Sequence, residues 1–157
     1  MINLGIYSAR QYDKSMNYSI LNPIADAELG ENAEIDFSVD PRKIIKAHIY
    51  LFRFPESDIF KAYPLFVISS KFRYILEQGG ITGAIYIPCE ISKTPDYDEA
   101  SQRIDLPDLF CLEPSGTDGL DDIIFHSEIE IKVSNRFLSK LQEVSSMFCD
   151  IYEASKE

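Results

Sequence analysis

The residues of this sequence whose types and spacing could support chemistry lie in a group of carboxylates near residue 120. Asp118, Asp121 and Asp122 follow Gly116 in a stretch of turn-forming residues, and His126 lies four positions further along. Clustered carboxylates on a turn are suitable ligands for a hard cation, and a histidine can act as a general acid or base. The spacing of a calcium-binding loop is missing, however. We therefore expect a solvated acidic turn without metal, and keep a small acidic metal-dependent enzyme that uses residues 118–126 as an alternative.

Nucleophilic catalysis requires a serine, threonine or cysteine beside a base that a third group orients. The sequence has two histidines, and His48 lies inside an apolar run, where a hydrogen-bonded structural histidine is expected. Cys89, Cys111 and Cys149 form neither a CxxC pair nor another zinc-ligand spacing, so we interpret them as reduced thiols that fill the core. No catalytic residue, cofactor or metal is predicted, and the protein is expected not to be an enzyme.

The composition argues against several classes of partner. Fifteen Lys and Arg residues against 26 Asp and Glu residues give a formal net charge of −11, which repels phosphate-rich molecules. Nucleic acid and membranes are therefore not expected as partners.

With 157 residues the chain is expected to form one domain, residues 1–157, around one core. No apolar run approaches the roughly 18 residues of a membrane span and no secretory signal is recognised, so a cytoplasmic protein is expected.

Negative charge is concentrated in residues 96–128, which contain ten acidic residues and one basic residue, Arg103. Such a segment can be a solvated face, or it can attract a basic partner and accelerate the encounter. Both interpretations stay open. If the segment binds a partner, an exposed Tyr97 or Phe125 is expected to anchor the contact. The candidate partner-binding residues are Tyr97, Asp98, Glu99, Asp118, Asp121, Asp122 and Phe125.

An internal near-repeat dominates the elements that must position these residues. Residues 65–76 are echoed by residues 130–141 when Ser69 is aligned with Ser134. A serine hydroxyl can accept a hydrogen bond from an early backbone N–H of a helix, so each serine is predicted to cap a short helix. The side chains three and seven positions after each serine share one helical face and should be buried. They are Phe72 and Leu76 in the first copy, and Phe137 and Leu141 in the second.

Each copy then enters a second apolar segment, at residues 84–87 in the first and 149–152 in the second. Gly79 and Gly80 are expected to end the first helix in a left-handed turn. The predicted module is strand, serine cap, helix, strand. Two such modules place the chain in the mixed α/β (α+β) class, with a central sheet and two or three short helices.

The remaining segments receive less definite predictions. Strands are predicted at residues 3–8 and 47–54 from their β-branched and aromatic content, although Asp40-Pro41 would also suit the start of a helix. Residues 9–45 otherwise receive no assignment. Residues 93–125 are expected to form a long, partly irregular connection that a few apolar groups fix to the core.

The two modules and the stretch between them resemble immunity proteins of bacterial polymorphic toxin systems. A hydrophobic strand that ends in Val-Ser, a helix that begins with a base and an aromatic residue, and Leu-Thr-Gly before a strand and proline are features of that group. The segments that carry the resemblance are Phe66-Val67-Ile68-Ser69, Ile81-Thr82-Gly83-Ala84-Ile85-Tyr86-Ile87-Pro88, Ser115-Gly116-Thr117-Asp118 and Val133-Ser134-Asn135-Arg136-Phe137.

The resemblance implies a small cytoplasmic antitoxin that neutralises a cognate toxin domain by direct protein binding. The strong negative charge would suit a basic toxin such as a nuclease. Two alternatives stay open. One is the metal-dependent enzyme described above, and the other is a chaperone or scaffold that binds an effector without inhibiting it.

Overall fold

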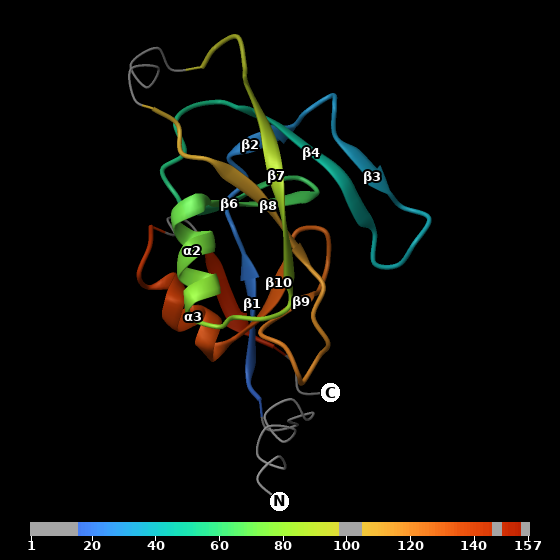
Figure 1. The fold of residues 1–157 in the computed structure, drawn as a ribbon, viewed down its shortest axis with the longest axis vertical. Coiled ribbons are helices and arrows are strands. Elements are labelled where there is room, and N and C mark those ends of the chain that lie inside the picture. Colours follow the sequence, from blue (N-terminus) through green and yellow to red (C-terminus); the bar gives the residue numbers. More distant parts are fainter. Residues whose placement is uncertain (1–15, 98–104, 146–148, 155–157) are drawn as a thin grey trace, which may run out of the picture.

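The computed structural model describes residues 16–97, 105–145 and 149–154. In this part of the chain, two sheets and two short helices form a mixed α+β structure that is mostly sheet (Figure 1). The predicted fold class is confirmed at this level. Two sheets are present, however, where one central sheet was expected.

The larger sheet has the strand order β2-β4-β7-β8-β6-β5, with β3 also paired to β4. Its strands are β2 (Ala27–Leu29), β3 (Glu34–Asp36), β4 (Lys43–Leu51), β5 (Ile59–Ala62), β6 (Leu65–Ser69), β7 (Ala84–Lys93) and β8 (Leu109–Pro114). The smaller sheet has the order β11-β1-β10-β9, formed by β1 (Tyr18–Asn22), β9 (Ile123–Phe125), β10 (Ile131–Ser134) and β11 (Asp150–Glu153). The helices are α2 (Ser70–Gln78) and α3 (Asn135–Leu141).

The near-repeat in the sequence corresponds to a repeated arrangement of strands. One unit has the order β5-β6-β8-β7 and the other β9-β10-β1-β11, and neighbouring strands are antiparallel throughout both. In each unit the helix connects two strands that run in the same direction, because both are antiparallel to the strand between them. This is a split β-α-β arrangement. In the second unit the middle strand is β1, which comes from a region that the sequence left without assignment.

Both predicted serine caps are present. The N–H of Phe72 donates to Oγ of Ser69 at 3.2 Å, and the N–H of Phe137 donates to Oγ of Ser134 at 3.2 Å. The two phenylalanine rings are fully buried and meet edge to face, with their centroids 5.6 Å apart. After α2, Gly80 has a φ of 68°, the left-handed conformation expected at the end of this helix.

Each serine cap is also bonded to an aspartate that precedes its hairpin. Oγ of Ser69 donates to Oδ1 of Asp58 at 2.7 Å, and Oγ of Ser134 donates to Oδ1 of Asp122 at 2.6 Å. Asp58 stands directly before β5, and Asp122 stands directly before β9. The carboxylate therefore fixes the hydroxyl that caps the helix of the same unit.

The second oxygen of each aspartate is bonded to the other unit. The N–H of Ser145, which follows α3, donates to Oδ2 of Asp58 at 2.9 Å. The N–H of Thr82, which follows α2, donates to Oδ2 of Asp122 at 3.0 Å. A backbone hydrogen bond accompanies each of these contacts. The N–H of Asp58 donates to the carbonyl of Ser145 at 2.6 Å, and the N–H of Asp122 donates to the carbonyl of Thr82 at 3.1 Å. We name these two sites the reciprocal aspartate clasp.

Two hydrophobic clusters lie on opposite faces of the larger sheet. In β6, Phe66 and Ile68 belong to one cluster, which also contains the buried faces of both helices, while Leu65 and Val67 belong to the other. Neighbouring residues of a strand point to opposite faces, so this strand is buried on both sides. The expectation of one core is therefore wrong, and the uninterrupted apolar run in β6 is explained.

Other expectations need correction. The strand predicted at residues 47–54 is displaced, because β4 covers residues 43–51. The connection at residues 93–125 is less irregular than expected, since β8 lies inside the larger sheet, between β6 and β7. The strand predicted at residues 3–8 lies outside the described residues. Among the described helices, none has the length and hydropathy needed to cross a membrane.

The edge-to-face pair between the two helices gives the first prediction. Replacing Phe72 or Phe137 by Ala should lower the free energy of unfolding by about 3–5 kcal/mol, because each substitution leaves a cavity in the shared core. Tyr74, on the same helix as Phe72, is 64% exposed, so Tyr74→Ala is the control and should change stability by less than about 0.5 kcal/mol. Urea denaturation followed by circular dichroism measures both. A loss below about 1 kcal/mol at both phenylalanines would contradict the shared core.

Candidate functional site

Asp122, one of the candidate residues of the acidic segment, is structural. Asp122 is only 3% exposed. Its oxygens accept hydrogen bonds from Ser134 and Thr82 in the reciprocal aspartate clasp, and Nε of Arg136 lies 3.9 Å from Oδ1. The prediction that Asp122 points to solvent is therefore wrong, because its hydrogen-bonding capacity is used inside the fold.

Asp121 is buried as well. Its Oδ2 accepts from the N–H of Thr117 at 2.7 Å. Two glycines allow the chain to approach here, since a Cβ at Gly83 or Gly116 would collide with the carbonyl of Ile123 and crowd the Cβ of Asp121. The exposure expected of Asp121 is therefore also wrong. The segments 81–88 and 115–118, which carry part of the resemblance, meet at this turn and serve to position it.

The other candidates of the acidic segment are spread over different environments. Tyr97 was expected to be an exposed anchor, but it is buried in the second hydrophobic cluster, with Nζ of Lys93 4.8 Å from its ring centroid. Asp98 and Glu99 lie outside the described residues. Asp118 is exposed and forms an ion pair with Lys132 at 2.8 Å. Phe125 is partly buried at the end of β9.

The structure also bears on the residues considered for catalysis. His48 is buried, accepts from the N–H of Asn32 at 3.0 Å through Nδ1, and lies 2.8 Å from the hydroxyl of Ser92 through Nε2, as expected of a structural histidine. His126 is largely exposed, with Nε2 4.0 Å from a carboxylate oxygen of Glu130. The described residues contain no group of three or more His, Cys, Asp or Glu side chains that could hold a metal ion.

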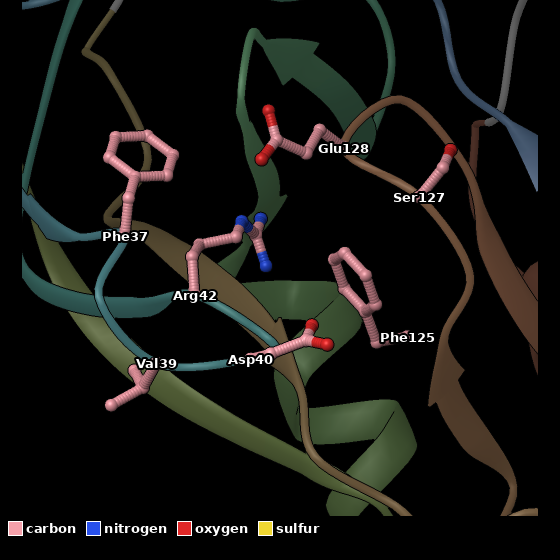
Figure 2. A pocket seen from close by; sticks show the side chains of 7 residues that line it. All are labelled: Phe37, Val39, Asp40, Arg42, Phe125, Ser127 and Glu128. Atoms are coloured by element: carbon pink, nitrogen blue, oxygen red, sulfur yellow. The ribbon is translucent and has the colours of Figure 1, made fainter.

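An open hollow of about 430 Å³ lies where the acidic segment ends (Figure 2). Its lining comes from the turn between β3 and β4 and from the end of β9 with the turn that follows it. We name it the Arg42 hollow. Its lining residues are Phe37, Val39, Asp40, Arg42, Phe125, Ser127 and Glu128.

Arg42 is the buried member of this lining, with 6% of its surface exposed. Nη2 donates to the carbonyl oxygen of Pro64 at 2.7 Å, whereas Nε and Nη1 have no hydrogen-bond partner among the described residues. Figure 2 shows the guanidinium group pointing toward the space between Phe125 and Glu128, and its central carbon lies 5.0 Å from the Phe125 ring centroid. A buried donor without a partner costs about 1–3 kcal/mol, so an oxygen acceptor at this place would be stabilising.

The rim of the hollow combines exposed aromatic rings with carboxylates. Phe37 is 62% exposed, and Tyr63, which lies beside the lining, is 58% exposed. The hydroxyl of Tyr63 donates to Oε2 of Glu128 at 3.0 Å, and this hydrogen bond and the negative charge of Glu128 raise the pKa of Tyr63. Apolar surface that is rimmed by polar groups is typical of protein-binding sites.

Three segments position the hollow, and two of them are equivalent in the repeated units. The β5–β6 turn provides Tyr63 and Pro64, and the β9–β10 turn provides Glu128. The two turns are also joined by Lys61, whose Nζ donates to the carbonyl of Ile129 at 3.1 Å. The third segment, between β3 and β4, belongs to neither repeated unit. The hollow therefore lies where the repeated frame meets the part of the larger sheet that is not repeated.

The sequence offered little to reveal this site. Of its lining, only Phe125 had been named as a candidate for partner binding. Phe37 and Val39 stand in a short polar stretch, and exposed apolar residues there are a weak sign of a surface contact. The burial of Arg42 depends on Pro64 and Phe125, which are distant in the sequence, so spacing could not reveal it.

Neither a protein-family model, nor a curated protein, nor a solved structure matches this chain.

The buried and exposed aspartates of the acidic segment should respond differently to neutralisation. Asp122→Asn should lower the free energy of unfolding by about 3 kcal/mol. Both oxygens of the carboxylate accept hydrogen bonds, whereas the amide has one accepting oxygen and an NH₂ group that can only donate. Asp118→Asn removes the same charge from an exposed ion pair and should cost less than about 1 kcal/mol. Chemical denaturation of the two variants provides the comparison. Equal stability would show that Asp122 is not structural.

The three thiols should be unreactive in the folded protein. Burial raises the pKa of Cys89 and of Cys111 to about 12, and that of Cys149 to about 11. The thiolate is the reactive form, and a raised pKa leaves it scarce at pH 8. Iodoacetamide should therefore modify the native protein slowly and the urea-unfolded protein at all three positions, as followed by mass spectrometry. A thiol that reacts in the native protein as fast as free cysteine would contradict this burial.

Proposed function

We propose that this protein is a bacterial immunity protein that neutralises a cognate toxin domain by direct binding. It acts in the cytoplasm as a single domain, and it needs neither a cofactor nor turnover. The Arg42 hollow and its rim form the central part of the surface that meets the toxin.

The observation that carries this proposal is the combination of a buried arginine with exposed aromatic side chains around one open hollow. Phe37 and Tyr63 expose most of their surface, and two nitrogens of Arg42 have no partner among the described residues. Binding energy between proteins tends to concentrate in a few aromatic and arginine residues near the centre of an interface. An open hollow suits a protruding segment of a protein better than a small molecule, which usually needs an enclosed pocket.

The resemblance to immunity proteins supports the biological role. Several of the residues that carry it support the frame, since Ser69 and Ser134 cap the helices and Gly83 and Gly116 allow the Asp121 turn to pack. Residues of this kind specify a fold without specifying a partner. The residues of the hollow that would choose the toxin, such as Phe37 and Arg42, lie outside the segments of resemblance.

The charge of the chain favours a basic toxin, such as a nuclease. The formal net charge of −11 would attract a positively charged domain at long range. Asp40 and Glu128 bring part of that charge to the rim of the hollow. The electrostatic contribution would act mainly on the rate of association, while the aromatic and arginine contacts would determine how slowly the complex dissociates.

The test uses the toxin domain encoded by the neighbouring open reading frame. Co-expression of this protein should restore growth of cells that make the toxin, and the purified protein should abolish toxin activity at a ratio of about one to one. The double variant Phe37→Ser, Tyr63→Ser should raise the dissociation constant at least tenfold while keeping the fold, because it removes two exposed aromatic contacts.

A matched control removes two exposed apolar side chains that do not line the hollow. The variant Tyr74→Ser, Ile85→Ser changes residues on α2 and β7 that are 64% and 53% exposed, and it should bind as the wild type does. If the control weakens binding more than the hollow variant, the interface lies elsewhere. Binding of the toxin without loss of its activity would indicate a chaperone, and inhibition far below stoichiometric amounts would indicate an enzyme.

A further inference from the structure

From the chemistry of its lining we infer that the Arg42 hollow receives a basic polypeptide segment. A backbone carbonyl of that segment accepts from Arg42, and a Lys or Arg side chain of the same segment lies between Asp40 and Glu128. This inference deepens the proposed function and rests on it for its biological meaning. It also predicts binding that can be measured without a toxin.

The unpartnered donors define the first half of the ligand. Nε and Nη1 of Arg42 are buried and lack partners among the described residues, while Nη2 is held by Pro64. A guanidinium group donates and never accepts, so the ligand must present an oxygen. Figure 2 shows the side chains of Phe125 and Glu128 on either side of the space that the guanidinium group faces. They come from a strand end and a turn, and side chains at an interface commonly change rotamer on docking.

The charge of the lining defines the second half. Arg42 contributes one positive charge, and Asp40 and Glu128 contribute two negative charges, so the hollow has a net charge of 1 − 2 = −1. A free carboxylate or phosphate would satisfy Arg42 but would meet both carboxylates. A neutral backbone carbonyl satisfies Arg42 without that repulsion, and a neighbouring cation is attracted by the two acids.

The aromatic groups at the hollow favour the same ligand. Phe37 and Tyr63 expose their rings beside the carboxylates, and the ring of Phe125 already lies against a guanidinium group. An ammonium or guanidinium group can therefore meet both a carboxylate and an aromatic face here. A hydroxyl side chain in the same place could donate to a carboxylate but would gain no cation–π contact, and an acidic side chain would gain neither contact.

Three blocked tripeptides test the inference with the full-length protein: acetyl-Lys-Gly-Lys-amide, acetyl-Ser-Gly-Ser-amide and acetyl-Glu-Gly-Glu-amide. The signals followed are the Nε–Hε resonance of Arg42 and the backbone amides of residues 37–40, 42 and 125–128 in ¹H–¹⁵N spectra. The basic peptide should shift them saturably, with a dissociation constant of roughly millimolar order for so small a ligand. The neutral peptide should bind at least fivefold more weakly, and the acidic peptide should leave the signals unchanged.

Two variants separate the contributions. The double variant Asp40→Asn, Glu128→Gln should weaken binding of the basic peptide at least fivefold. The control Asp150→Asn, Glu153→Gln makes an equal charge change on the exposed strand β11 and should leave the binding unchanged. Arg42→Lys keeps the positive charge but removes the planar donors, so it should also weaken binding of the basic peptide. The shift of the backbone amide signal of Phe37 measures this. Thermal unfolding confirms that each variant is folded, and the two acid-to-amide variants remain informative if Arg42→Lys is not.

Several outcomes would overturn the inference. Tighter binding of the acidic peptide would make the hollow an anion site. Equal binding of all three peptides would remove the role of the carboxylates, and shifts that are absent from Arg42 but present elsewhere would place basic peptides on another acidic surface. Because no toxin is used, loss of toxin neutralisation in the hollow variants and failure of the peptides to bind are separate results, and either can occur without the other.

Discussion

The fold depends on one interaction that is made twice, the reciprocal aspartate clasp. Asp58 and Asp122 each accept from the serine that caps the helix of their own unit and from the backbone that leaves the helix of the other unit. A carboxylate has two oxygens with several acceptor positions, so one side chain can join its own segment to two others. Each unit is thereby fixed to the other at two points, and the helices meet between them through Phe72 and Phe137.

This constraint explains why the duplicated frame offers few groups for function. The serines, aspartates and phenylalanines that are equivalent in the two units are used as caps, acceptors and core, and the side-chain oxygens of the serines and aspartates are bonded within the molecule. The segment from β2 to β4 has no counterpart in the second unit. Arg42 comes from this segment, and it is held by Pro64 of one repeated turn and covered by Phe125 at the edge of the other. The site thus forms where a segment without a counterpart in the second unit meets the two repeated units.

The sequence predicts the elements that depend on local chemistry and misses those that depend on distant contacts. The caps at Ser69 and Ser134 and the buried Phe72 and Phe137 follow from spacing over a few residues, and all were predicted. The role of β1 could not be predicted, because it is set by pairing with strands more than a hundred residues away. The same limit applies to the site, where Arg42, directly before a strand of the larger sheet, contacts Phe125, at the end of a strand of the smaller sheet.

The acidic segment shows why charge counted along a sequence is a poor guide to the charge that a partner meets. Asp121 and Asp122 were counted as part of one negative stretch, yet both are buried and bonded within the fold, and Asp118 is paired with Lys132. A partner that approaches the hollow would meet other carboxylates, those of Asp40 and Glu128, and Asp40 lies well before the acidic segment, which begins at residue 96. Folding thus redistributes the charge: part of it stabilises the frame, and a smaller part surrounds the one buried arginine of the hollow. In the complex that we propose, this local balance of charge would determine specificity more than the net charge of the chain.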